Sequence, residues 1–299
     1  MDLDGDGLTD VLSGCYTHRD GSRAVVGEFY LLRGTEQGLA KPERLRGTDG
    51  ELLVIRPLEE GEDAAFERMC TRPTAVDLDG DGHLDIVSGN ETGHFALFRG
   101  GPGGFEPENS WLRNAEGERL EVRGHSDPHF ADWDADGDLD LLSGSRSGGV
   151  SWFPNLGTRN APRFGDARCL VPTVPKGSSS SDLVLGEDHI TGPQIATRVT
   201  TADVDEDGKL DLLVGDAVEI IRPAEGLTDD ECRRRFAEWN TNHRRIVRSQ
   251  PEFGGHGRRT AEQEAEMEAF YARRQAHWEK RQAIVDKRST GYVWLFLRK

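Results

Sequence analysis

Carboxylates at alternate positions of a short loop are the residues of this sequence best placed to do chemistry. The pattern Asp-x-Asp-x-Asp-Gly-x-x-Asp occurs four times in 299 residues, at 2–10, 77–85, 132–140 and 203–211. Alternate carboxylates in a tight loop converge on one point, and their repulsion is costly unless a hard dication such as Ca²⁺ neutralises it. The sequence therefore predicts up to four calcium-binding loops.

Each copy of the pattern offers the same set of oxygen ligands. Positions one, three, five and nine supply Asp carboxylates, and position seven supplies a backbone carbonyl, so its side chain can vary. The predicted ligands are Asp2, Asp4, Asp6, Leu8 and Asp10; Asp77, Asp79, Asp81, His83 and Asp85; Asp132, Asp134, Asp136, Asp138 and Asp140; and Asp203, Asp205, Asp207, Lys209 and Asp211. Position six is always glycine, which suits a sharp turn at positive φ. Acidic turns without metal are the alternative.

The residues after each loop indicate which elements the loop joins. An EF-hand loop begins in the same way, but it needs a bidentate Glu at position twelve and a helix on each side. Position twelve here is Ser13, Ser88, Ser143 or Val214, and short aliphatic runs that stop at glycine follow position nine. Such runs are typical of buried strands, so each loop is expected to join two β-strands.

The similarity between the copies extends beyond the loops. A strand-like segment leads into each of the last three loops. Third strands are expected within 27–34, 93–100, 149–154 and 291–297, and fourth strands within 38–45, 104–112 and 162–170. Four short strands per unit predict an all-β protein, a β-propeller of four-stranded antiparallel blades. The four repeats are expected at about 1–72, 73–128, 129–194 and 195–299.

These motifs resemble the FG-GAP or VCBS-type repeats of integrin α subunits and of many secreted bacterial proteins. The Phe-Gly and Gly-Ala-Pro signatures of the integrin version are absent. In that family the Asp-rich loop joins the first two strands of a blade and binds Ca²⁺. The resemblance implies a metal-stabilised binding scaffold that carries out no reaction. It also implies a secreted, periplasmic or cell-surface location.

Both ends of the chain lack part of a repeat. Met1 stands where the other copies have the end of a leading strand, and Lys299 directly follows the third strand of the last repeat. An open blade edge exposes unpaired backbone groups. We therefore expect an N-terminally truncated form of a longer propeller, with an intact open or four-bladed form as the alternative.

Residues 226–289 interrupt the strand pattern and predict an α-helical hairpin inserted in the last blade. Capping boxes at 228–231 and 260–263 mark two helix starts. Apolar residues then recur at helical spacing, first as Cys232, Phe236, Trp239 and Ile246 and then as Met267, Phe270, Tyr271, Trp278 and Val285. The hairpin returns the chain so that the sheet can resume at Gly291.

Charge argues against nucleic acid as a partner. The net charge is −17, and segment 226–289 holds 14 Lys and Arg against 11 Asp and Glu, which leaves −20 on the remainder. The basic residues of the hairpin are interleaved with acids, and an acidic propeller repels phosphate. No run approaches the ~20 apolar residues that span a bilayer, so no transmembrane segment is expected.

The cysteines and histidines form no recognised catalytic motif. Cys15 and Cys70 flank neighbouring predicted strands, and the sequence leaves open whether they form a disulfide or remain thiols. His125 and His129 beside Asp127 are more typical of a loop than of a catalytic set. No Gly-x-Ser-x-Gly elbow, phosphate loop or His-Glu-x-x-His helix is present. An enzyme is therefore not expected, with a glycosidase-like carboxylate pair as the remaining hydrolase alternative.

Two functional classes follow from the sequence. The first is a calcium-braced scaffold for interaction or adhesion, whose protein partner is unknown, and the second is a lectin-like propeller that binds a glycan. Exposed aromatic rings would favour the glycan, whereas burial would leave them only a packing role. The discriminating residues are Trp111, Trp133, Trp152 and Trp294, and we expect most of them to be buried.

Overall fold

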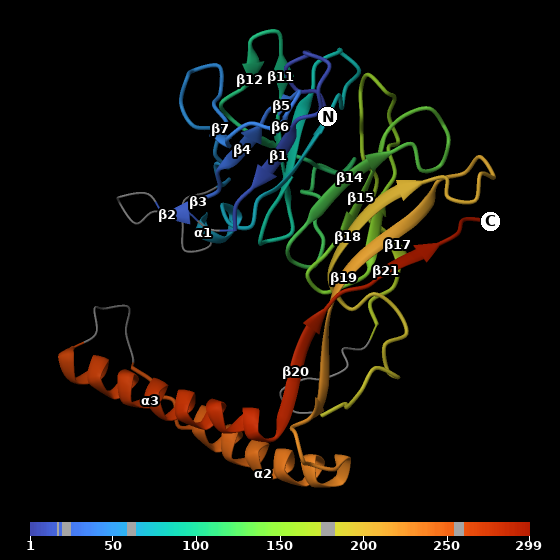
Figure 1. The fold of residues 1–299 in the computed structure, drawn as a ribbon. Helices are drawn as coiled ribbons and strands as arrows, with labels where there is room; N and C mark the ends of the chain where they lie inside the picture. The colour runs from blue at the N-terminus through green and yellow to red at the C-terminus, as the bar shows by residue number, and fades with distance from the viewer. Residues whose placement is uncertain (17, 20–24, 59–63, 175–182, 254–259) are drawn as a thin grey trace. The chain divides into compact units, whose positions relative to one another are not determined.

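Short antiparallel strands make up most of the regular structure, as the computed structural model in Figure 1 shows. The structure describes residues 1–299 except 17, 20–24, 59–63, 175–182 and 254–259. Four main sheets follow one another along the chain, one for each aspartate loop. The prediction of an all-β fold built from antiparallel four-stranded sheets is confirmed, with helices confined to a few segments.

In the first three sheets the strands pair as antiparallel neighbours in chain order, whereas in the fourth sheet one long strand pairs with the other three. The first contains β1 (Val11–Gly14), β4 (Phe29–Leu32) and β7 (Glu43–Arg44). The second contains β8 (Arg72–Val76), β9 (Asp85–Gly89), β10 (Phe95–Phe98) and β13 (Ser110–Trp111). The third contains β14 (Asp127–Ala131), β15 (Asp140–Gly144), β16 (Val150–Phe153) and β17 (Arg168–Val171). The fourth contains β18 (Ile195–Ala202), β19 (Asp211–Pro223), β20 (Val285–Thr290) and β21 (Val293–Phe296).

Three small ribbons and one short helix complete the strand-rich part. The ribbons pair β2 (His18–Arg19) with β3 (Val25–Val26), β5 (Gly34–Thr35) with β6 (Gly38–Leu39), and β11 (Gly100–Gly101) with β12 (Gly104–Phe105). The helix α1 spans Ala64–Glu67. The expected third strands at 27–34, 93–100, 149–154 and 291–297 correspond to β4, β10, β16 and β21.

The second sheet buries one face against the first sheet and the other face against the third. Ile86 and Val87 are adjacent on β9 and both are fully buried. Because alternate residues of a strand point to opposite faces, Ile86 packs with Phe29 of the first sheet and Val87 with Leu141 of the third. Burying such a side chain contributes roughly 1.5–3 kcal/mol. Stacked sheets of this kind are the arrangement of propeller blades.

The glycine that ends the second strand of a sheet lets the next sheet approach. A Cβ on Gly89 would lie 2.0 Å from the carbonyl oxygen of Ser126, which no side chain could tolerate. The Ser126 N–H donates to the Asn90 carbonyl (3.1 Å), and the Ser126 hydroxyl accepts from the Asn90 N–H (3.0 Å). Gly14 and Gly144 make the same close approach to Thr71 and Thr197. The glycine of the recurring Ser-Gly therefore lies where each sheet contacts the next one.

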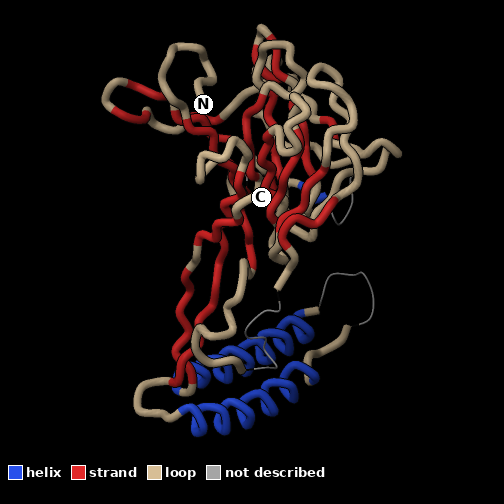
Figure 2. The backbone as a smooth tube through the Cα atoms, turned by 90° about the vertical axis from the view of Figure 1, so that its right-hand side faces the viewer, coloured by secondary structure: helices blue, strands red, loops and turns tan. Residues whose placement is uncertain are grey.

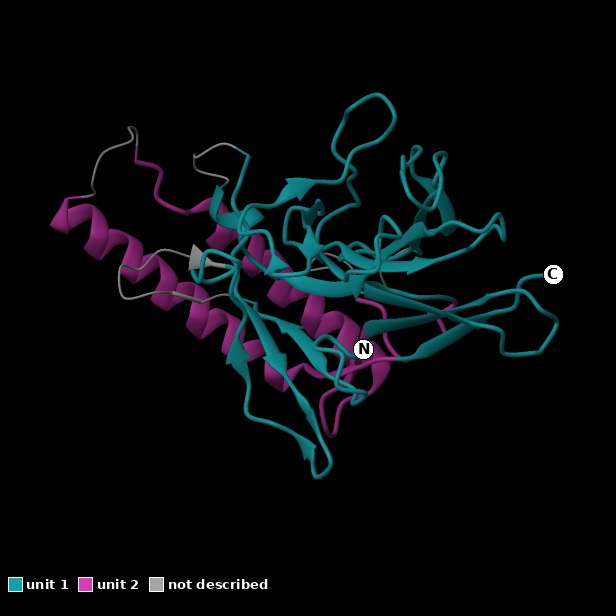
Figure 3. Cartoon of the chain, turned by 90° about the horizontal axis from the view of Figure 1, so that it is seen from above, with its two compact units in different colours: residues 1–174, 192–217, 292–299 teal, residues 175–191, 218–291 magenta. Residues whose placement is uncertain are grey.

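The chain divides into two compact units, coloured separately in Figure 3. Unit 1 comprises Met1–Val174, Gly192–Ala217 and Tyr292–Lys299, and it holds all four aspartate loops. Unit 2 comprises Pro175–Thr191 and Val218–Gly291. Strand β19 contributes to both, because residues up to Ala217 pair with β18 while Val218–Pro223 pair with β20.

Unit 2 contains the predicted helical hairpin, whose two helices lie side by side in Figure 2. They are α2 (Asp229–Arg248) and α3 (Ala261–Glu279), and residues 254–259 of the predicted hairpin lie outside the described residues. Thr260 and Gln263 form a complete capping box. At the start of α2, the Thr228 hydroxyl accepts the Glu231 N–H, which is one half of the predicted capping box. The Glu231 carboxylate does not complete the box, because it binds the Arg234 and Arg235 guanidinium groups.

The second helix is shorter than its apolar spacing suggested. It ends at Glu279, a 3₁₀ turn η1 (Lys280–Ala283) follows, and Val285 opens strand β20. Val285 is buried in the cluster under α2 that contains Cys232 and Phe236, and its expected place in the second helix was wrong because it lies in a strand. None of the described helices combines the length and the apolarity required to cross a membrane.

Candidate metal centres

The first aspartate of each loop organises the backbone of that loop. Its Oδ2 accepts the N–H of the position-six glycine in all four copies, from Gly7 (2.8 Å), Gly82 (3.3 Å), Gly137 (3.1 Å) and Gly208 (2.9 Å). These glycines have φ between +84° and +97°, a conformation in which a Cβ is strained. The position-five Asp then accepts the N–H of position seven, as Asp81 does from His83 (2.8 Å).

These turns bring three carboxylates of each loop together. In the first three loops they come from positions one, three and five, namely Asp2, Asp4 and Asp6; Asp77, Asp79 and Asp81; and Asp132, Asp134 and Asp136. In the fourth loop they are Asp203, Asp205 and Asp211. Within each group the ligand oxygens lie within 4.8 Å of one another. Clusters of this kind could hold a metal ion, because oxygens this close repel each other without a cation.

The position-nine aspartate has a structural task that the sequence pattern did not reveal. Asp10, Asp85, Asp140 and Asp211 are all at most 3% exposed. In the second loop Asp85 Oδ2 accepts the Leu78 N–H (3.3 Å) and Oδ1 accepts the Gly100 N–H (2.8 Å). The carboxylate thus links the start of the loop to the second residue after the third strand. The same two bonds recur in every copy.

Burial and hydrogen bonding shift the pKa values of these position-nine aspartates in opposite directions. Burial raises the pKa of Asp140 to about 6, against the lowering effect of the Asn155 N–H that it accepts. Burial likewise raises the pKa of Asp85. The Arg298 N–H, followed by that of Val204, lowers the pKa of Asp211. The charge on a position-nine aspartate is therefore least favourable in the middle two loops.

Asp138 differs from the other position-seven residues. It was predicted to contribute only its carbonyl, yet its side chain is 7% exposed and its Oδ1 has no hydrogen-bond partner among the described residues. Burial raises the pKa of Asp138, and the charges of Asp136, Asp134 and Asp132 raise it further. The sequence signal was available, since the third loop alone has an acid at position seven.

Among the described residues, arginines form ion pairs with carboxylates of the first and second loops, which sequence reasoning also missed. Arg99 Nη1 lies 2.6 Å from Asp79 Oδ2 and 3.1 Å from Asp85 Oδ2. Arg33 makes the equivalent contact with Asp4 in the first loop. Both arginines immediately precede the glycine that donates to the position-nine aspartate. Pro154 and Leu297 hold this place in the third and fourth repeats and supply no charge.

Comparison with known proteins agrees with this repeating geometry. Residues 77–143 and 132–214 each match the model of a family described as FG-GAP-like repeat. Each match begins at the first aspartate of a loop and runs into the strand that follows the next loop. A search of curated proteins found no match. Through these two segments, the chain is an FG-GAP-type repeat protein.

Proposed function

We propose that this protein is a non-catalytic, calcium-braced scaffold that binds protein partners outside the cytoplasm. The observation that carries the proposal is the third loop. There the cluster of three carboxylates is accompanied by Asp138, whose buried Oδ1 lacks a hydrogen-bond partner within the described chain. Asp138 is close enough to the cluster for the three charges to raise its pKa, and so much acidic charge is unfavourable unless a cation balances it.

The donor set favours calcium over other dications. Every predicted ligand in the four loops is a carboxylate or carbonyl oxygen, which suits a hard ion that accepts six to eight oxygens in flexible geometry. Magnesium demands a near-ideal octahedron, and zinc prefers nitrogen and sulfur. The third loop would hold the ion through Asp132, Asp134 and Asp136, with Asp138 adding a side-chain or carbonyl oxygen.

The environment of the tryptophans supports a protein-binding scaffold over a lectin. Trp111 and Trp133 are each 8% exposed, and Trp152 and Trp294 are partly buried against a core cluster. Arginine guanidinium groups cover three of the rings, with Arg119 over Trp111 (5.3 Å), Arg168 over Trp152 (4.9 Å) and Arg298 over Trp133 (4.9 Å). Rings covered in this way leave little open face on which a sugar could stack.

Strand β21 is the strongest candidate for a partner-binding surface. Val293 is 73% exposed, and Leu295 and Leu297 are about half exposed. The strand pairs with β19 on one side. An exposed apolar strand edge is a template on which another chain can pair its backbone.

Calcium dependence of stability tests the proposal. At ten times its dissociation constant, calcium adds about 1.4 kcal/mol per site to the free energy of unfolding. Asp136→Asn keeps an oxygen that can accept the Asp138 N–H but removes the charge. We expect this variant to lose about 1.4 kcal/mol of the calcium-induced stabilisation, about 3–6 °C in melting temperature.

Glu106→Gln is the matched control, because this exposed carboxylate lies outside every loop. Calorimetric titration with calcium and thermal melts with and without EDTA measure both variants. The proposal fails if EDTA leaves the wild-type melting temperature unchanged, or if the two variants respond equally. A glycan array probed with and without EDTA distinguishes the lectin alternative, for which calcium-dependent spots would be the supporting result.

A further inference from the structure

A second type of side-chain cluster lies at the opposite ends of the strands from the aspartate loops. Strand β8 leads into the second loop at Val76, and strand β14 leads into the third loop at Ala131. Cys70 precedes the start of β8, and His125 precedes the start of β14. Glu91 lies in the turn after β9, so all three residues gather at the ends of strands remote from the loops.

Backbone hydrogen bonds between successive sheets fix these three positions. The Glu91 N–H donates to the Met69 carbonyl (2.8 Å), and the His125 N–H donates to the Glu91 carbonyl (3.1 Å). Cys70, His125 and Ala196 occupy equivalent places in three repeats, and all have positive φ, at 56°, 43° and 50°. The unusual backbone is thus a property of the repeat, as Ala196 shows, and the chemistry of the cluster comes from the side chains.

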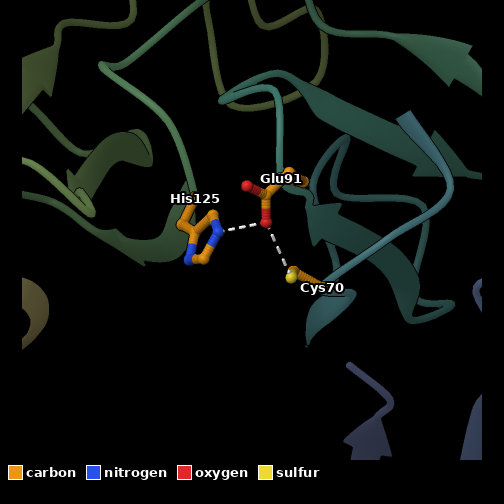
Figure 4. Close-up of side chains that lie close together, drawn as sticks. All are labelled: Cys70, Glu91 and His125. Atoms are coloured by element: carbon orange, nitrogen blue, oxygen red, sulfur yellow. Dashed lines mark hydrogen bonds and ion pairs between the residues drawn. The ribbon is translucent and has the colours of Figure 1, made fainter. Parts of the chain in front are cut away.

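The three side chains point toward one another (Figure 4). Cys70 Sγ lies 3.0 Å from Glu91 Oε2, and His125 Nε2 contacts the same oxygen. The ligand atoms all lie within 4.8 Å of one another. Cys70 is 3% exposed and His125 is 7% exposed, and the buried Nε2 makes no hydrogen bond of ordinary geometry. Glu91 Oε1 is held separately by Arg146 Nη1 (3.0 Å).

These donors differ in kind from those of the aspartate loops. Sulfur, imidazole nitrogen and carboxylate oxygen together suit zinc and similar first-row transition ions. Two ligands on a tetrahedral zinc lie about 3.5 Å apart, given bonds of about 2.0–2.3 Å. A thiolate, a carboxylate and a neutral imidazole carry two negative charges, which one divalent ion would balance. Arg146 would orient the carboxylate, as partners of ligating groups commonly do.

We propose that Cys70 Sγ, Glu91 Oε2 and His125 Nε2 bind one zinc-type transition-metal ion, with water as the fourth ligand. Binding releases the thiol proton and leaves Nε2 without a proton, so the lone pairs of sulfur and nitrogen are available to the metal. The ion would join residues at the ends of two successive sheets, because Cys70 and Glu91 flank strands of the second sheet and His125 precedes the third. It would do so independently of calcium in the loops.

The competing account is a thiol–carboxylate–imidazole network that holds no metal. In that account the thiol donates to Glu91, and burial, followed by Glu91, raises the pKa of Cys70 to about 12. The cluster is not part of a disulfide, since Cys15 and Cys70 are both thiols in the structure, which answers the question that the sequence left open. A nucleophilic role is disfavoured because so little thiolate would exist near neutral pH.

Cobalt binding separates the two accounts. The full-length protein is reduced, saturated with calcium to fill the loops, and titrated with Co²⁺. We expect a near-ultraviolet thiolate-to-cobalt charge-transfer band that saturates at one ion per chain and disappears when Zn²⁺ is added. Cys70→Ser should abolish the band, and Glu91→Gln and His125→Gln should weaken cobalt binding at least about tenfold.

Cys169→Ser is the control, because it removes an exposed thiol elsewhere in unit 1 and should leave the band intact. Wild-type protein that shows no band at millimolar Co²⁺ overturns the proposal, as does a band that survives Cys70→Ser. If cobalt binds but no thiolate band appears, the cobalt is bound at the carboxylate loops, and this result also overturns the proposal. If a variant does not fold, alkylation of wild-type Cys70, mapped by mass spectrometry, should be slower with Zn²⁺ than without it, and equal rates would contradict the site.

Discussion

Aspartates that look equivalent in the sequence divide into two roles in the structure. Asp77 and Asp81 belong to an exposed or half-buried cluster that could accept a cation. Asp85, four residues later, is buried and spends both oxygens on backbone N–H groups from two different segments. In the second loop, substitution of Asp85 should therefore damage the fold of the blade even without metal, whereas substitution of Asp81 should mainly reduce the response to metal.

The arginines divide the loops into two classes. Arg99 places its guanidinium among the carboxylates of the second loop, and Arg33 does so in the first. We expect Arg99→Met to tighten calcium binding at the second loop about 2- to 5-fold, because a half-exposed ion pair contributes about 0.5–1 kcal/mol. Calorimetric titration should show two weaker and two stronger sites in the wild type.

Arg113→Met is the control for this prediction. The Arg113 guanidinium donates to the Gly117 carbonyl at a distance of 2.7 Å, so its loss should not change calcium affinity. Four indistinguishable sites in the wild type, or an unchanged affinity in Arg99→Met, would show that the guanidinium does not compete with the ion.

The elements of unit 2 meet in a stack of aromatic rings. Trp239 of α2 stacks with His243 (centroids 4.9 Å apart) and with His277 of α3 (5.0 Å). The Trp239 Nε1–H also donates to the His277 carbonyl (2.9 Å). Arg281 lies over the same group of rings, 5.3 Å from the centroid of Trp278. The two helices are therefore held together by packed rings. Because Arg281 already places a positive charge beside these rings, a further positive charge there is unfavourable.

Acid should loosen this hairpin. Burial lowers the pKa of His243, and His277, Arg274 and Arg281 lower it further. A histidine whose folded-state pKa lies below its unfolded value of about 6.5 contributes stability above that pH, and this stability is lost as the pH falls through the folded-state pKa. We expect the helical circular dichroism signal to melt at lower temperature as the pH is lowered below 6.5.

His243→Phe keeps a ring in the stack and removes the titrating group. It should reduce the pH dependence of the helical melt relative to the wild type. Because α2 and α3 hold nearly all the described helix, the helical signal reports on unit 2. A pH dependence equal in the wild type and His243→Phe would assign the effect to other groups.

At the scale of the whole molecule, charge and structure divide the chain in the same way. All four acidic loops lie in unit 1, and the helices α2 and α3 lie in unit 2. Segment 226–289 is slightly basic, although the chain as a whole carries −17. Metal removal should therefore act on one unit alone.

We expect EDTA to lower the melting temperature of the strand-rich unit and to leave the helical melt in place. The physical reason is that metal-free loops gain carboxylate repulsion, whereas the hairpin contains no such loop. Differential scanning calorimetry, combined with circular dichroism at a helical wavelength, measures the two units separately. A single transition that shifts as a whole would show that the units unfold together.

The sequence predicted the parts of the fold that depend on short-range spacing. Alternation of Asp, with glycine at position six, specified four turns, and the aliphatic run after Asp85 specified a strand with no helix. The capping box at Thr260 located α3, since both of its hydrogen bonds lie within one turn. Val285 was wrongly assigned to a helix, because the spacing of a single apolar residue does not distinguish a helix from a strand.

The sequence by itself determined the repeat, the turn chemistry of the loops and the presence of a helical hairpin, because each depends on residues within about ten positions of one another. Only the tertiary structure decided that Asp85 hydrogen-bonds to the backbone beyond the third strand, that Arg99 pairs with the carboxylates of the second loop and that Arg119 covers Trp111. It alone brought together Cys70, Glu91 and His125, which no motif connects. The reason is that these contacts form when one sheet stacks on the next. The stacking depends on the burial of apolar side chains and on hydrogen bonds between sheets, and both involve residues far apart in the chain.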